Sequence, residues 1–169
     1  LSLEILLPAA WLHDCVHVAK DSPQRSKASG LAADHALVIL QTYRYPEQHF
    51  GDIHHAIEAH SFSANITPET IEAKVLQDAD RIDALGAVGL SRCLMLGGHI
   101  GSDLYHIKDP FVANRTINDA KYCVDHFYAK LLKLKDTMQT EAGKALAEER
   151  TQFLLDFLKQ LGTEIGRTP

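Results

Sequence analysis

Histidine residues are concentrated in the first part of this chain, where several stand beside carboxylates. Seven of the ten histidines lie before residue 61. A single histidine is more often a surface residue than a ligand, but a group of imidazole and carboxylate side chains suits a divalent cation. Because a site of this kind takes its ligands from several helices, the sequence predicts a metal site assembled by the helices of this region.

The segment WLHDCVH, residues 11–17, places an imidazole next to a carboxylate directly after an apolar run. His13 and His17 are four residues apart and share one face of a helix if the helix continues through them. Cys15 points about 100° away from Asp14 on an ideal helix and is interpreted as a packing residue. His13 and Asp14 are therefore the first candidate metal ligands.

A second group of donors occurs in HHAIEAH, residues 54–60. His55 and His60 are five residues apart, which is about 140° around an ideal helix. Their side chains therefore diverge unless the helix ends or bends near His60. On spacing alone, an exposed helix end is the simpler interpretation of both histidines.

A third group is QDADRIDALG, residues 77–86. Asp78 and Asp80 lie about 200° apart on a helix, so only one of them can face a given site. The periodicity of the neighbouring apolar residues does not choose between the two. The alternative interpretation is a solvated acidic helix, in which Arg81 forms surface ion pairs that contribute little to stability.

Composition sets the class of protein. The chain has 169 residues, of which 46% are hydrophobic, and this is enough to bury the core of one domain. A formal net charge of -5 disfavours a nucleic-acid binder, because affinity for the phosphate backbone comes from clustered Lys and Arg. A small anionic substrate is compatible with this charge. Three cysteines without a CxxC pair indicate a reducing cytoplasm, and residues 1–12 are too short and interrupted to cross a membrane.

The apolar periodicity is helical almost throughout and no segment alternates as a strand does, so the sequence predicts an all-α fold. Thr67 as N-cap, with Pro68 and Glu69 in the first turn, predicts a helix that begins near Pro68. Gly97 and Gly98 are expected to close the helix after that one. Helices are expected over residues 31–43, about 53–60, 68–83, 85–96, 121–134 and 141–165, with loops over residues 20–30 and 99–118.

Several phrases resemble the HD superfamily of metal-dependent phosphohydrolases, and within it the small stand-alone bacterial HD hydrolases. These phrases are WLHDCV, HAIEAHSFS and VLQDADRIDALGAVGL, followed by DPF and DHFYAKLLKL. The similarity extends over essentially the whole chain and depends on the order of the motifs. It implies a single-domain helical HD fold.

The resemblance also implies a set of metal ligands. In the family, one divalent cation is held by a histidine, then a His-Asp pair, then an aspartate. His13 and Asp14 match the pair, and Asp80 matches the final aspartate because its Ala-Asp-Arg-Ile setting corresponds to the family's Ala-Asp-x-Leu; Asp78 matches less well. The first histidine has no counterpart, so we expect residues 1–169 to be one HD domain that lacks an N-terminal helix of the full-length protein.

Roles around the metal are implied in the same way. His17 stands three positions after Asp14, where several branches of the family have a glutamate that transfers protons, and an imidazole can serve in this role near neutral pH. His55 and His60 correspond to histidines that reach the substrate phosphates or a second metal, and we expect them to bind the substrate. Lys20 would add a cation near the same opening.

The implied function is metal-dependent hydrolysis of a small phosphorylated substrate, with nucleotides as the leading class, by loss of phosphate or pyrophosphate. A bound divalent ion would polarise a phosphoryl oxygen and lower the pKa of bound water. The ligands do not distinguish Mn, Mg, Fe, Co, Ni and Zn. The alternative is a non-catalytic, nucleotide-responsive or scaffolding HD module. A zinc protease is disfavoured, because its motif needs Glu directly after the first histidine, where this chain has Asp14.

Overall fold

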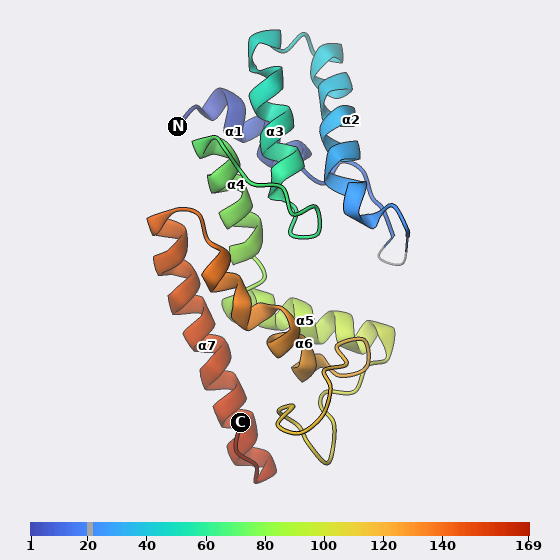
Figure 1. The fold of residues 1–169 in the computed structure, drawn as a ribbon, viewed down its shortest axis with the longest axis vertical. Helices are drawn as coiled ribbons and strands as arrows, with labels where there is room; N and C mark the ends of the chain where they lie inside the picture. Colours follow the sequence, from blue (N-terminus) through green and yellow to red (C-terminus); the bar gives the residue numbers. More distant parts are fainter. Residues whose placement is uncertain (20–21) are drawn as a thin grey trace. The chain divides into compact units, whose positions relative to one another are not determined.

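The computed structural model describes residues 1–19 and 22–169, and this part of the chain is helical and contains no β-strand (Figure 1). The predicted all-α class is confirmed. Within the same residues, no helix has both the length and the apolar composition needed to cross a bilayer. The helices are α1 (Leu3–Leu12), α2 (Ala28–Thr42), α3 (Phe50–His60), α4 (Ile71–Ile82), α5 (Gly86–Ile100), α6 (Cys123–Ala129) and α7 (Glu141–Ile165), with 3-10 helices η1 (Arg25–Lys27), η2 (Glu47–His49) and η3 (Leu131–Thr137).

The chain forms two compact units, Leu1–Asp80 and Arg81–Pro169, each with its own apolar core. In the first unit, α3 packs against α2 and α1, and α2 and α3 lie side by side in Figure 1. Ile53 and Ile57 are one helical turn apart on α3 and are fully buried. Small residues on α2, such as Ala36, let the two helices approach closely.

Polar contacts fix α1 within the first unit. Tyr45 donates its hydroxyl hydrogen to the carbonyl oxygen of Glu4 over 2.7 Å, and the side chains of His49 and Glu4 are 3.2 Å apart. From α4, Glu72 accepts a 2.6 Å hydrogen bond from the amide of Ser2. This bond holds the pKa of Glu72 below its usual range. The position of α1 is therefore set by polar contacts with two other segments as well as by the core.

The beginning of α4 differs from the sequence prediction. Thr67 and Pro68 were expected to start this helix, but it begins at Ile71. Thr70 is the residue that caps it, because its hydroxyl accepts the amide hydrogen of Ala73 over 3.2 Å. The expected start was therefore wrong by three residues.

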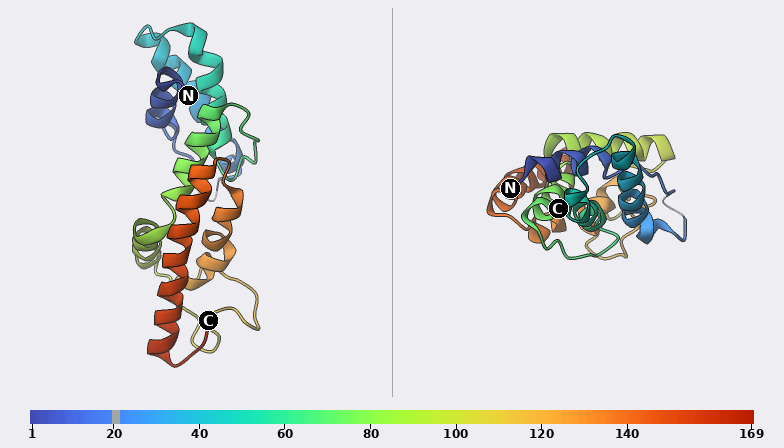
Figure 2. Two further views of the ribbon diagram at one scale, coloured as in Figure 1. Left: turned by 90° about the vertical axis from the view of Figure 1, so that its left-hand side faces the viewer. Right: turned by 90° about the horizontal axis from the view of Figure 1, so that it is seen from above.

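In the second unit, α7 packs against α5 and η3, and η3 packs against α6 (Figure 2). The rings of Phe127 and Phe157 stack with their centroids 5.8 Å apart. At the start of α7, the side chain of Thr140 accepts a hydrogen bond from the amide of Gly143, and Gly166 ends the helix in the left-handed region with φ 65°. The predicted bounds of 141–165 are confirmed.

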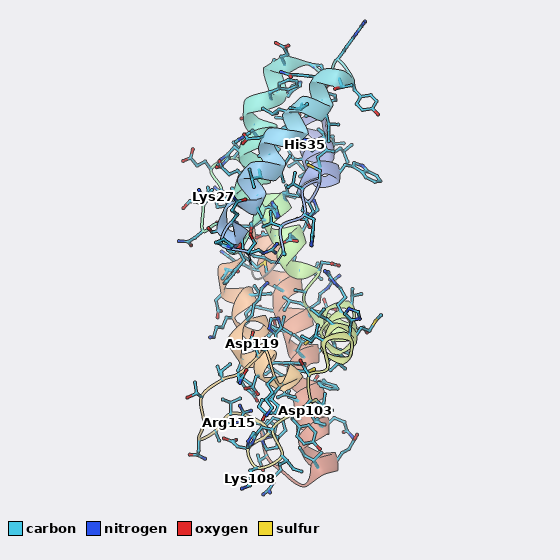
Figure 3. The ribbon with its side chains drawn as sticks, turned by 90° about the vertical axis from the view of Figure 1, so that its right-hand side faces the viewer. Lys27, His35, Asp103, Lys108, Arg115 and Asp119 are labelled. Atoms are coloured by element: carbon cyan, nitrogen blue, oxygen red, sulfur yellow. The ribbon has the colours of Figure 1, made fainter. Side chains whose placement is uncertain are left out.

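A long loop joins α5 to α6 and is held by one buried carboxylate. Asp125, which is fully buried, accepts hydrogen bonds from both terminal guanidinium nitrogens of Arg115, one of them at 2.6 Å, and from the amide of Asn118. These bonds raise the pKa of Arg115, whose guanidinium also lies over the ring of Tyr122. Figure 3 labels Arg115 and Asp119 in this loop.

The end of α5 and the start of α6 also differ from the prediction. α5 continues past Gly97 and Gly98 to Ile100, and Gly101 ends it with φ 76°. The helix expected over residues 121–134 is instead divided into α6 and η3. The division lies at Lys130, whose backbone departs from helical geometry with φ -136° and ψ -59°.

Two neighbouring glycines of α5 provide a matched test of this packing. A Cβ atom on Gly97 would overlap the sulfur of Cys123, whereas a Cβ on Gly98 would meet nothing within 4 Å. We expect Gly97→Ala to lower the free energy of unfolding by about 1–3 kcal/mol. Gly98→Ala is expected to raise it by about 0.5–1 kcal/mol, because alanine loses less backbone entropy in a helix. Urea unfolding followed by circular dichroism measures both, and equal effects of the two variants would contradict this packing.

Candidate metal centre

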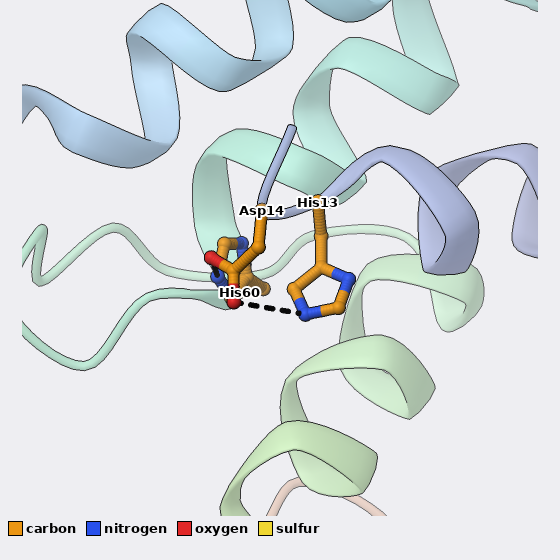
Figure 4. A group of neighbouring side chains, drawn as sticks. All are labelled: His13, Asp14 and His60. Atoms are coloured by element: carbon orange, nitrogen blue, oxygen red, sulfur yellow. Dashed lines mark ion pairs between the residues drawn. The ribbon is translucent and has the colours of Figure 1, made fainter. Parts of the chain in front are cut away.

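The first and third helices each end at a histidine, and these histidines lie next to each other in the first unit. α1 ends at Leu12, so that His13 is its C-cap and Asp14 follows in a turn. α3 ends with His60 as its last residue, and the chain becomes extended at Ser61. The three side chains point toward one another in Figure 4. His55 and His60 do diverge as their spacing predicts, since His60 faces Asp14 whereas His55 bonds to the amide of Glu69.

Asp14 stands between two imidazoles. One of its carboxylate oxygens is 3.5 Å from Nε2 of His13, and the other is 3.8 Å from Nε2 of His60. The two imidazole rings are edge to face, with centroids 4.9 Å apart. One ligand atom from each of the three residues lies within 4.8 Å of the other two. No other group of three or more such donors at this spacing occurs among the residues that the structure describes.

Both histidines are held by the same kind of backbone bond. Nδ1 of His13 donates to the carbonyl oxygen of Ala10 over 2.8 Å, and Nδ1 of His60 donates to the carbonyl oxygen of Ile57. A carbonyl oxygen can only accept, so the neutral form of each ring carries its hydrogen on Nδ1. Nε2 then has a free lone pair that faces Asp14. This is the arrangement in which an imidazole binds a metal ion.

The donor set and its spacing fit a divalent cation. Nitrogen and oxygen ligands lie about 2.1 Å from such an ion, so two of its ligands are at most about 4.2 Å apart. Both distances from Asp14 to the imidazole nitrogens satisfy this limit. The ligand atoms as a group extend to 4.8 Å. The widest pair would therefore have to close by at least about 0.6 Å for the three side chains to share one ion.

The group is buried on one side and open on the other. The side chain of His60 is only 6% exposed, whereas that of Asp14 is 79% exposed. Asp14 is thus accessible to an ion and a substrate from solvent. Cys15, the next residue, donates its thiol hydrogen to the carbonyl oxygen of Ala32 and burial raises its pKa, in agreement with a packing role.

The two candidate aspartates of α4 are placed differently. Asp78 is buried, with 3% exposure, and Asp80 is exposed. Neither contributes an atom to the group formed by His13, Asp14 and His60. The assignment of Asp80 as a metal ligand therefore stays a prediction.

The remaining candidates lie outside the group. His17 is exposed and lies outside the helices, because α1 ends at Leu12 and does not continue through it. The condition under which His13 and His17 would share a helix face is therefore not met. Nε2 of His55 accepts the amide hydrogen of Glu69 over 2.9 Å and so helps to hold the loop before α4. Lys20 lies outside the described residues.

An all-helical fold that brings a His-Asp pair to a second histidine is the arrangement expected of an HD domain. The family model described as HD domain matches residues 1–85, half of the chain, and the chain belongs to the HD-domain family. This confirms the resemblance drawn from the motifs. The matched residues include the whole first unit, Leu1–Asp80, which contains His13, Asp14 and His60.

The relatives found include small bacterial proteins of the same superfamily. The structure of Bacillus subtilis YpgQ in complex with ADP matches with a TM-score of 0.71 and 34% identity, over 97% of this chain and 78% of that one. An HD-superfamily hydrolase from Bacillus thuringiensis matches with a TM-score of 0.69 and 32% identity, over 95% and 72%. The uncharacterized protein YpgQ of Bacillus subtilis strain 168 is 44% identical over 98 residues, which are 58% of this chain and 42% of that protein. That aligned sequence thus spans less than half of the relative.

Proposed function

We propose that this chain is a divalent-metal-dependent phosphohydrolase that acts on a small phosphorylated substrate, with nucleotides as the leading class. The observation that carries the proposal is the group of His13, Asp14 and His60, in which two imidazoles offer Nε2 on either side of one carboxylate. Membership of the HD-domain family supports hydrolysis. The crystallisation of the related YpgQ with ADP supports a nucleotide.

We assign His13 and Asp14 to the metal, as the family pattern implies, and we add His60. A histidine that binds phosphate needs a hydrogen on the nitrogen that faces it, whereas His60 uses its Nδ1 hydrogen on the carbonyl of Ile57. Its Nε2 is therefore suited to a cation in the neutral form. Asp80 remains our proposed aspartate from α4, with Asp78 as the competing residue.

A divalent ion in this position supplies Lewis acidity, which polarises a phosphoryl oxygen and lowers the pKa of water in contact with it. The protein's side chains position the substrate, transfer protons and offset phosphate charge. The carboxylate of Asp14 and the fixed imidazoles set where the substrate is held, and we assign proton transfer to the exposed His17. His55 and Lys20 are proposed to offset phosphate charge, His55 through Nδ1 because Nε2 already accepts from Glu69.

A nucleotide panel tests this function. The purified full-length protein is incubated with nucleoside mono-, di- and triphosphates, with and without Mn²⁺ or Mg²⁺, and released phosphate and pyrophosphate are measured. We expect release only with metal, and its loss in Asp80→Ala but not in Asp78→Ala. Release that survives Asp80→Ala would refute that ligand. Tight nucleotide binding without any release would favour the non-catalytic module instead.

A further inference from the structure

We propose that Gln77 is a positioning residue for the metal centre, which acts by fixing the end of α3 so that His60 presents Nε2 to Asp14. The inference rests on the proposed function, since it concerns the same metal site. Gln77 is on α4, is 1% exposed, and does not belong to the group of metal donors. It lies within the motif VLQDADRIDALGAVGL, where the sequence assigns it no role.

The contact that Gln77 makes is directly beside His60. Its Nε2 donates to the carbonyl oxygen of Ala59 over 2.6 Å. Ala59 is fully buried and is the residue before His60, the last residue of α3. The carbonyl groups in the last turn of a helix have no partner within the helix. Gln77 therefore satisfies a carbonyl that would otherwise be buried and unpaired.

Two carbonyl oxygens near the end of α3 each accept a hydrogen bond from a different side chain. Ala59 receives the amide hydrogen of Gln77, and Ile57 receives the Nδ1 hydrogen of His60. Without Gln77, the buried carbonyl of Ala59 would lack a donor, and the imidazole hydrogen of the next residue would be a competing partner for it. The ring would then no longer be held in one orientation. Either carbonyl would leave the hydrogen on Nδ1, so what depends on this division is the direction in which the Nε2 lone pair points.

Only one end of the Gln77 amide is satisfied. The other end of its amide, Oε1, is buried and has no hydrogen-bond partner. A buried polar atom without a partner is destabilising, and an apolar side chain of the same length would avoid it. What the amide provides, and a methionine would not, is the donor to Ala59. Among second-sphere contacts of this kind, loss of the partner commonly weakens metal binding about 10–100-fold.

The test compares Gln77→Met with Glu72→Gln, a variant on the same helix that weakens the contact of α4 with Ser2 and leaves the end of α3 untouched. Mn²⁺ affinity is measured by calorimetry. The ¹⁵N resonances of the His60 ring are recorded in the metal-free proteins at about pH 8, above the ordinary pKa of histidine. We expect Gln77→Met to bind Mn²⁺ about 10-fold more weakly and to show shifted or broadened His60 ring resonances, because the ring is no longer held in one orientation. Glu72→Gln should match the wild type in both measurements.

An unchanged His60 spectrum together with unchanged Mn²⁺ affinity in folded Gln77→Met would overturn the inference. If that variant does not fold, the wild type decides: the side-chain amide of Gln77 should be protected from hydrogen exchange and should shift with His60 as Mg²⁺ is added. An unprotected amide, or one that does not respond to the ion, counts against the inference. Absence of hydrolysis in the nucleotide panel would refute the proposed function alone, because none of these measurements depends on turnover.

Discussion

Replacement of Asp14 by alanine is expected to weaken Mn²⁺ binding by about 100-fold or more and to remove metal-dependent hydrolysis. The carboxylate is the only negatively charged member of the group and lies within 3.8 Å of both imidazole nitrogens. Without it, the ion would have only the two neutral imidazole nitrogens of the group as ligands, with no carboxylate between them. Since changes in the second sphere already cost about 10–100-fold, removal of a direct ligand should cost at least the upper value. Calorimetric titration with Mn²⁺ measures the affinity.

Asp34 is the matched control for this variant. Its carboxylate is 75% exposed, close to the 79% of Asp14, and it is also paired with a histidine, His54, at 3.0 Å. Asp34 does not belong to the group of metal donors, which consists of His13, Asp14 and His60. Asp34→Ala should therefore bind Mn²⁺ as the wild type does. Similar affinities of Asp14→Ala and Asp34→Ala would show that the ion binds elsewhere.

The sequence predicted those helices whose limits depend on local signals. α7 has the expected bounds, because a threonine caps it and a glycine in the left-handed region ends it. α5 was expected to stop at Gly97, but Gly97 lies against the sulfur of Cys123, and the helix continues to Ile100. That contact joins segments far apart in the sequence. Local composition therefore could not distinguish a glycine that ends a helix from one that allows close packing.

The metal centre was predictable to the extent that its ligands are neighbours in the sequence. His13 and Asp14 are adjacent, and the structure groups them. His60 was assigned to the substrate by the resemblance to the family, and its spacing of five residues from His55 alone indicated an exposed helix end. The structure ends α3 at His60 and so frees its ring to meet Asp14. Only the position of the helix end relative to Asp14 could have shown this, and that position depends on the tertiary structure.

The second large effect is expected in the second unit, where Asp125→Ala should lower the free energy of unfolding by about 3–5 kcal/mol. Removal of one partner of a buried ion pair leaves the other charge without compensation. Here the carboxylate is fully buried and binds both terminal nitrogens of Arg115 as well as the amide of Asn118. Urea unfolding followed by circular dichroism measures the loss. We also expect faster proteolysis within residues 101–122, which this carboxylate holds in place.

Asp119 provides the comparison, since it pairs with His126 at 3.0 Å but is 47% exposed. A pair in contact with water contributes about 0–1 kcal/mol, so Asp119→Ala should have a small effect. The double variant Arg115→Met with Asp125→Leu separates charge from packing, because apolar side chains can replace a buried ion pair at little cost. It should recover much of the loss seen in Asp125→Ala, although not the bond to the amide of Asn118. If Asp125→Ala cost no more than Asp119→Ala, the buried carboxylate would not be what holds the loop.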